Sequence, residues 1–212
     1  MPFKSIADLE TREDGLVKAT TLRELLRRDG CLTLPGVFDG ISARVAASIG
    51  FDALYMTGYG AVASALGAAV AGTATFTEML DRVRCIAGAI DVPFIADGDT
   101  GYGGLLNVDR TVRGYAAAGA SGIQLEDQEF PKKCGHTEFR RVIPAADAIA
   151  KIRVAVDARP GRDFLIVART DLAQSFLLAC RIFRRSGPQP DHTRNDPVGR
   201  NQWFPVPERQ YF

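Results

Sequence analysis

The 212-residue sequence lacks the signatures of several protein classes. It has only four cysteines, widely scattered and in no C-x-x-C pair, which argues against a zinc ribbon and against a disulfide framework. Its formal net charge is only +1, so it lacks the basic excess that indicates nucleic-acid binding. It has no uninterrupted apolar run long enough to span a bilayer. We therefore expect a globular protein whose partner is neither nucleic acid nor membrane.

The first residues lack the features of a targeting segment. Residues 1–15 alternate charged and apolar side chains and include four acids, so they resemble neither a secretory signal nor an acid-poor transit peptide. A cytoplasmic enzyme is the resulting expectation, with a mitochondrial location as the alternative for a eukaryotic source.

What the sequence does contain is a regular alternation of helix-like and strand-like segments. Helical spacing of apolar residues predicts helices over residues 20–28, 41–49, 77–89, 108–118 and 145–158. Short apolar segments predict strands over residues 31–38, 53–57, 92–96, 123–127 and 164–167. Residues 61–75 are rich in alanine and glycine, and we expect a mobile loop and part of a helix that cross the strand ends. Strands that alternate with helices, without hairpin turns, predict βα units and a parallel sheet.

We therefore predict an α/β fold of the (β/α)8 TIM-barrel type, in an incomplete version of about five βα units. A complete barrel needs about 250 residues, which is more than this chain has. Residues 172–182 are compatible with a helix, but residues 181–212 are rich in arginine and proline and have no regular period. The expected organisation is a partial barrel domain over residues 1–180 and an irregular tail over residues 181–212.

Each predicted strand leads into polar or glycine-rich residues at its carboxyl end. (β/α)8 barrels and open α/β sheets have their active sites at that end. Five such ends in succession favour a shared cleft. They supply Asp39, then Thr57-Gly58-Tyr59, then Asp97 and Asp99, then Glu126 and Asp127, and finally Arg169 and Asp171.

Asp97 and Asp99 follow a buried strand one residue apart. Because side chains alternate along a strand, both carboxylates would point the same way if the extended geometry persists to Asp99. They could then share one hard divalent cation such as Mg²⁺, which prefers oxygen ligands. The competing interpretation is a solvated Asp/Gly turn, and the D-x-D pattern alone favours that interpretation.

A basic loop, Lys132-Lys133-Cys134-Gly135-His136, follows the strand that ends near Glu126. A thiol flanked by lysines and a histidine is expected to have a lowered pKa and to donate or accept a proton near neutral pH. Gly135 would let the backbone approach a ligand closely. An exposed basic loop with an incidental cysteine is an equally weighted alternative. The other three cysteines lie among apolar neighbours and are expected in the core: Cys31, Cys85 and Cys180.

Five motifs carry a family resemblance together. They are Thr57–Gly60, Ile95–Gly103, Gln124–Gln128, Lys132–His136 and Ala168–Asp171. In this order and at these spacings, they resemble the isocitrate lyase and phosphoenolpyruvate mutase superfamily over about residues 32–171. The lysine–cysteine–glycine–histidine loop is the most specific motif. It makes the chain most similar to the 2-methylisocitrate lyase and dimethylmalate lyase branch, because the superfamily's mutases, phosphonate hydrolases and oxaloacetate decarboxylases lack the cysteine.

The resemblance implies cleavage of a 2-hydroxy di- or tricarboxylate, similar to 2-methylisocitrate, into a 2-oxo acid such as pyruvate and a dicarboxylate. It implies a Mg²⁺ ion, or Mn²⁺, held by Asp97 and Asp99 and, through water, by Glu126. It also implies a homo-oligomer, since the family forms tetramers. Two alternatives stay open: a non-catalytic truncated barrel or interaction subunit, and an oxaloacetate decarboxylase or phosphonate-processing enzyme of the same superfamily.

The resemblance also assigns roles to residues around the substrate. Cys134 would protonate the carbanion left by bond cleavage, while Lys132 and His136 set the charge state of the thiol. Tyr55 is a candidate for the base on the 2-hydroxyl group, or it only packs. The remaining roles belong to substrate-binding residues, with Thr57, Gly58 and Tyr59 on one carboxylate, Gly135 in close approach, and Arg169 on a further carboxylate.

Three features weigh against a simple transfer of these roles. Arg169 could instead form a structural ion pair with Asp171 or Asp127. Val70 stands where the family commonly has an aspartate that supports the metal ligands, so we expect weaker Mg²⁺ binding. No segment after Asp171 matches the later strands of the family, which supply a further acid and a substrate-binding segment.

Overall fold

The computed structural model describes residues 13–135, 137, 140–171 and 179–182 of the chain. Its strands form one sheet in chain order, in which β1 to β5 are parallel and β6 is antiparallel to β5. The predicted α/β class with parallel βα units of the (β/α) barrel type is therefore confirmed. The strands are β1 (Gly36–Val37), β2 (Leu54–Met56), β3 (Phe94–Asp97), β4 (Gly122–Glu126), β5 (Leu165–Thr170) and β6 (Ala179–Ile182).

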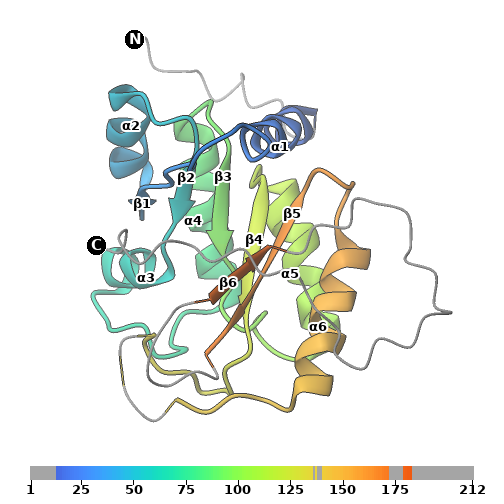
Figure 1. The fold of residues 1–212 in the computed structure, drawn as a ribbon. Coiled ribbons are helices and arrows are strands. Elements are labelled where there is room, and N and C mark those ends of the chain that lie inside the picture. The colour runs from blue at the N-terminus through green and yellow to red at the C-terminus, as the bar shows by residue number, and fades with distance from the viewer. Residues whose placement is uncertain (1–12, 136, 138–139, 172–178, 183–212) are drawn as a thin grey trace, which may run out of the picture.

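Six helices accompany the sheet in the described part of the chain. One of them, α1, lies near the amino ends of β2 and β3, and the others flank the strands (Figure 1). The helices are α1 (Glu13–Leu25), α2 (Gly40–Ile49), α3 (Gly58–Leu66), α4 (Phe76–Ala89), α5 (Leu105–Ala117) and α6 (Ala145–Ala158). None of the helices within these described ranges is long and apolar enough to cross a membrane.

Local sequence signals explain where several helices begin and end. Asp39 caps α2, because its carboxylate accepts a hydrogen bond from the Ser42 N–H at 2.7 Å, while the Ser42 hydroxyl accepts one from the Asp39 N–H. Gly50 ends α2 with a φ of 102°, a left-handed conformation that glycine adopts without steric cost. Thr75 and Glu78 form the same reciprocal cap at the start of α4. Asp39 is thus a structural residue rather than part of a shared cleft.

Two apolar clusters lie on opposite faces of the sheet. The larger one contains Met56, Phe94 and Ile123 together with the apolar sides of the flanking helices. The smaller one lies on the inner face, where Leu22 and Leu25 of α1 pack with strand side chains. The strand side chains of this inner cluster are Ala53, Ile95, Leu165 and Val167, with half-buried Tyr55 against them.

Helices were predicted more accurately than the first strand and the last segment. The helix over residues 145–158 is confirmed to the residue, but the helix predicted over residues 20–28 spans Glu13–Leu25 instead. Only Gly36–Val37 of the strand predicted over residues 31–38 pairs with β2. The helix proposed for residues 172–182 is wrong at its end, because Ala179–Ile182 forms β6. This strand depends on its pairing with β5, and the local sequence has no periodicity that predicts it.

Two further predictions concern surface segments. The part-helix expected within residues 61–75 is confirmed as α3, which begins earlier, at Gly58. The prediction that Cys31 and Cys85 are core residues is wrong, since both are exposed, although their neighbours in sequence are apolar. The side chain of Cys180 and most of the predicted tail over residues 181–212 lie outside the described residues.

Candidate active site

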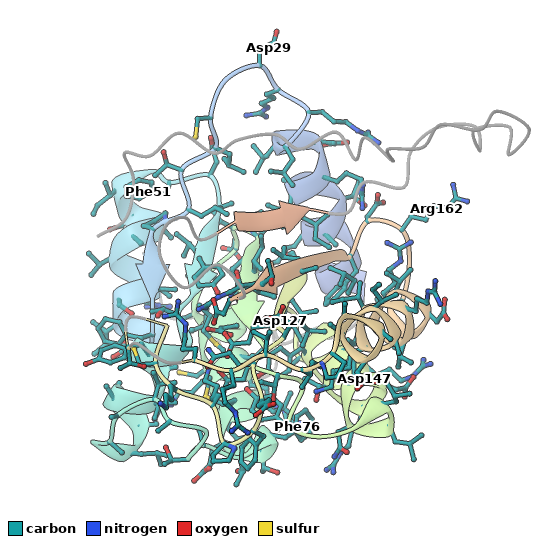
Figure 2. The ribbon with its side chains drawn as sticks, turned by 60° about the horizontal axis from the view of Figure 1, so that its bottom comes forward. Asp29, Phe51, Phe76, Asp127, Asp147 and Arg162 are labelled. Carbon is teal, nitrogen blue, oxygen red and sulfur yellow. The ribbon has the colours of Figure 1, made fainter. Side chains whose placement is uncertain are left out.

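The charged strand ends converge on the inner face of the sheet. Asp97 of β3 pairs in register with Gln124 of β4, and Glu126 of β4 pairs with Arg169 of β5. Residues directly paired in neighbouring strands project to the same face, so these side chains line one surface. Figure 2 brings this end of the sheet forward, with Asp127 near its middle. The polar ends of β3, β4 and β5, three of the five predicted strand ends, therefore lie together on one surface.

Asp97 and Asp99 are buried rather than solvated. Only 8% of Asp97 and 4% of Asp99 is exposed, so the interpretation as a solvated turn is wrong. The expected extended geometry also fails, because Asp99 has a left-handed φ of 49°. The Asp97 carboxylate instead stabilises the turn, because it accepts hydrogen bonds from the Asp99 N–H at 2.9 Å and from the Gly58 N–H at 3.2 Å.

Gly58 at the start of α3 is required by this close contact. A Cβ atom at this position would lie 2.6 Å from Oδ2 of Asp97, so any side chain here would displace the Asp97 carboxylate. Thr57 precedes it as the N-cap residue of α3, but its hydroxyl makes no capping hydrogen bond to the helix. Tyr59 is exposed on the first turn. The structure therefore places the three predicted carboxylate-binding residues at a helix N-terminus beside Asp97.

Lys132 lies among the predicted metal ligands. Its ammonium group forms ion pairs with Asp99 and, at 3.1 Å, with Oε1 of Glu126, and all three side chains are buried. Burial alone would lower the pKa of Lys132, but the charges of Asp97, Asp99 and Glu126 outweigh that effect and raise the pKa above its usual range. Lys132 is therefore the counter-ion of Asp99 and Glu126 inside the acid cluster.

Arg169 joins the end of β5 to the end of β4. Its guanidinium lies 3.2 Å from Oε2 of Glu126 and donates hydrogen bonds to both oxygens of Asp171, at 3.0 to 3.1 Å. The alternative of a structural ion pair with Asp171 is thus confirmed. Among the described residues, Arg169 forms no ion pair with Asp127, which instead accepts hydrogen bonds from the Thr170 hydroxyl and the Asp171 N–H.

The two most crowded carboxyl groups bind protons more readily than usual. Burial raises the pKa of Glu126, and the attraction of Lys132 only partly offsets it. Burial and the neighbouring charge of Asp97 likewise raise the pKa of Asp99. Oε2 of Glu126 is also buried and has the ion pair with Arg169 but no hydrogen bond. Desolvated carboxylates in this state gain from any further cation that can reach them.

The chemistry of these carboxylates fits a hard divalent cation, but a lysine ammonium already forms ion pairs with two of them. Asp97, Asp99 and Glu126 supply only oxygen ligands, and one oxygen of Glu126 has no hydrogen-bond partner. Within the described ranges, however, no three acidic, histidine or cysteine side chains are grouped as a metal site. The ammonium of Lys132, which contacts Asp99 and Glu126, accounts for part of this arrangement.

The Cys134 loop lies against the Arg169 end of the cluster. A Cβ atom on Gly135 would lie 2.5 Å from a guanidinium nitrogen of Arg169, so the glycine permits a close backbone approach. Cys134 is half-buried, and its carbonyl accepts a hydrogen bond from the Thr137 N–H at 3.0 Å. The structure brings this loop to the predicted metal ligands through Lys132, whereas His136 lies outside the described residues.

Two other predicted residues belong to the apolar clusters. Tyr55 packs against the inner apolar cluster beside Ile95 and Leu165. Val70 is buried in the outer apolar cluster, so this position adds no charge near the carboxylates. The segment around Val70 does reach the loop that follows β4, because a Cβ atom on Gly72 would lie 2.8 Å from the Phe130 ring.

Sequence reasoning gave no role to three polar groups that the structure brings to the site. Gln128 hydrogen-bonds to both Glu126 and Asp171. The guanidinium of Arg140 donates to the Gly135 carbonyl and lies 3.8 Å from Asp171. Tyr115 donates to the backbone carbonyl of Asp97 at 3.4 Å. For Gln128 a signal existed, since it continues the alternation of Gln124 and Glu126, while the other two become neighbours only through the fold.

Comparison with known proteins identifies relatives for this arrangement. The family model for phosphoenolpyruvate phosphomutase matches residues 22–191. The chain is 50% identical over 153 residues to 2,3-dimethylmalate lyase of Eubacterium barkeri, covering 72% of this chain and 53% of that protein. It is 44% identical over 150 residues to 2-methylisocitrate lyase of Aeropyrum pernix, covering 71% and 48%. The chain thus spans about half the length of the curated relatives it matches.

Solved structures agree with the sequence relatives. Oxaloacetate acetylhydrolase, in complex with the inhibitor 3,3-difluorooxalacetate, superposes with a TM-score of 0.72 at 42% identity, covering 79% of this chain and 57% of that one. Phosphonopyruvate hydrolase, in a complex with oxalate and Mg²⁺, superposes with a TM-score of 0.66 at 31% identity, covering 73% and 52%. In both comparisons the likeness is in sequence as well as in fold.

Proposed function

The chain belongs to the phosphoenolpyruvate phosphomutase family, and from this premise we propose that it is a carbon–carbon lyase acting on a 2-hydroxy di- or tricarboxylate. The observation that carries the proposal is the convergence of Asp97, Asp99, Glu126 and Arg169 with the Cys134 loop at one end of the sheet. The lyase names of two relatives at 50% and 44% identity support it.

Asp97, Asp99 and Glu126 would hold Mg²⁺ or Mn²⁺. When bound, such a cation supplies positive charge beside the oxygens of a 2-hydroxy acid. Thr57, Gly58 and Tyr59 would bind the adjacent carboxylate, because the N-terminus of α3 favours an anion and the Thr57 hydroxyl is not used to cap it. The metal dependence of this chain is part of the proposal, supported by the Mg²⁺ complex of a solved relative.

The reaction breaks one carbon–carbon bond and moves two protons. The 2-hydroxyl group loses its proton to a base, for which Tyr55 is the candidate, and the electron pair of the broken bond stays on the departing carbon. Cys134 donates its thiol proton to that carbon and becomes a thiolate. Lys132 and His136 would set the charge state of this thiol. Arg169 would orient a second carboxylate, in addition to its pair with Asp171.

A direct assay tests this proposal. The full chain is incubated with Mg²⁺ and either 2,3-dimethylmalate or 2-methylisocitrate, and the released 2-oxo acid is measured by its coupled reduction. Mg²⁺ binding is measured separately by calorimetry. Release of 2-oxo acid that is abolished by a chelator supports the proposal. Bound Mg²⁺ without 2-oxo acid from either substrate would contradict it and would favour a non-catalytic partial barrel or an interaction subunit.

One observation favours a second candidate reaction. The likeness to oxaloacetate acetylhydrolase, whose structure was solved with an oxaloacetate analogue, favours oxaloacetate as a substrate. Hydrolytic cleavage would consume water and release oxalate and acetate, whereas decarboxylation would release pyruvate and carbon dioxide. Chromatography of the products distinguishes the two, and phosphonopyruvate in the same assay tests the phosphonate-processing alternative.

A further inference from the structure

Gln128 is a buried amide at the centre of the site. Only 2% of it is exposed, and its side chain hydrogen-bonds to Glu126, Asp171 and the backbone of Lys133. Its Nε2 donates to Oε1 of Glu126 at 3.1 Å and to Oδ2 of Asp171 at 2.7 Å. Its Oε1 accepts a hydrogen bond from the backbone N–H of Lys133 at 3.1 Å. One side chain therefore ties the end of β4 and the end of β5 to the Cys134 loop.

Only an amide satisfies these three partners together. The carboxylates of Glu126 and Asp171 accept hydrogen bonds, and the N–H of Lys133 donates one. An amide offers two N–H donors and one oxygen acceptor in a single planar group. An ionised glutamate of the same size could still accept from Lys133, but it would repel both carboxylates. An apolar residue of the same size would leave Lys133 without this acceptor.

The Lys132–Lys133 peptide is held from both sides. The Lys132 side chain pairs with Asp99 and Glu126, and the next backbone N–H is bound by Gln128. Cys134 follows directly. Because two consecutive residues are anchored to the strand ends, the position of the thiol relative to the carboxylates depends on both anchors.

We propose that Gln128 is a positioning residue that fixes the Cys134 loop against the Glu126–Asp171 acid pair. The inference rests on the proposed lyase function for its consequence in catalysis, because the thiol must meet the carbon released by bond cleavage. Its structural part does not depend on turnover. Gln128 touches no reacting atom in this role, so its loss lowers kcat and leaves substrate KM nearly unchanged.

Two substitutions in the full chain separate the functions of the amide. Gln128→Met removes all three hydrogen bonds, so the Lys133 amide exchanges hydrogen about tenfold faster or more, and kcat falls at least about tenfold with KM within about threefold. Gln128→Glu keeps the acceptor for Lys133, so protection of that amide persists.

Glu129→Gln is the matched control, because it exchanges an acid for an amide at the next position, in a partly exposed pair with Arg141. It should leave Lys133 exchange and kcat unchanged. If Gln128→Met does not fold, Gln128→Asn replaces it, since its shorter amide cannot reach both sides.

The proposal is overturned if Gln128→Met, or Asn in its place, leaves Lys133 exchange and kcat within about twofold of wild type. It is also overturned if Gln128→Glu loses the protection of Lys133 as fully as Met does. If wild type releases no product from any substrate, the lyase proposal fails alone, because the exchange measurements still decide whether Gln128 holds the loop.

Discussion

The two ends of the inner sheet face differ sharply, although the same strands form both. Toward the amino ends, Tyr55, Ile95, Gly122 and Leu165 form a paired row that packs near Leu22 of α1. Toward the carboxyl ends, the same face carries the charged cluster of Asp97, Gln124, Glu126 and Arg169. A step of two residues along a strand keeps the same face and changes apolar packing into buried charge.

The difference teaches where stability and chemistry come from in this molecule. The apolar end removes hydrocarbon from water, which stabilises the fold. The charged end holds desolvated groups whose mutual attraction only offsets the cost of burying them, so it adds little net stability. We infer that the charged end is present for binding and reaction, which predicts opposite effects for substitutions at the two ends.

Substitution of Cys134 should have the largest effect and should break activity without breaking the fold. Cys134→Ser replaces a thiol by a hydroxyl that gives up its proton far less readily, so kcat should fall by about 10² to 10⁴. The thermal midpoint should stay near that of wild type, because the side chain is half-buried and nearly isosteric. Steady-state rates and thermal unfolding measure the two effects. Exposed Cys31→Ser is the control, and an undiminished rate in Cys134→Ser would contradict the proposed role.

Substitution of Leu22, at the amino end, should lower stability and leave activity intact. Leu22 is fully buried in the inner cluster, so Leu22→Ala leaves a cavity and should lower the free energy of unfolding by about 2 to 5 kcal/mol. Below the unfolding temperature, kcat should stay within about twofold of wild type. Urea unfolding gives the first quantity. Leu106→Ala is the control, because that leucine is 88% exposed and its loss should cost less than about 0.5 kcal/mol. Loss of activity in a folded Leu22→Ala protein would show that the two ends are coupled.

Asp39 should show the smallest effect, because it only caps α2. Asp39→Ala should cost about 1 kcal/mol, whereas Asp39→Asn should retain most of the stability because asparagine caps helices equally well. Hydrogen bonds from the backbone and side chain of Ser42 lower the pKa of Asp39 in the folded state. The contribution of the ionised cap is therefore complete above the unfolded pKa of about 3.9 and is lost as pH falls through the folded value. Urea unfolding at pH 7 and pH 3 should show the difference between wild type and Asp39→Ala shrinking in acid, and a difference that grows would contradict the capping role.

Much of the architecture could be predicted from local sequence, because helix periodicity and caps act over a few residues. The helix at Ala145–Ala158 and the end of α2 at Ile49 show this. The short strand Gly36–Val37 and the strand Ala179–Ile182 could not be predicted in this way. Their bounds depend on partners distant in sequence, and a strand exists only where a neighbour completes its hydrogen bonds.

The sequence by itself determined the family, the strand ends that carry the polar residues, and the types of those residues, since motif order and alternation are properties of the chain alone. Only the tertiary structure decided how those charges are shared. In the fold, Asp99 adopts a left-handed backbone conformation, and the Lys132 ammonium lies between two carboxylates. The fold also makes Gln128 the link between β4, β5 and the Cys134 loop. The physical reason is that ion pairs and buried hydrogen bonds depend on distances across the fold, which no local spacing in the sequence encodes.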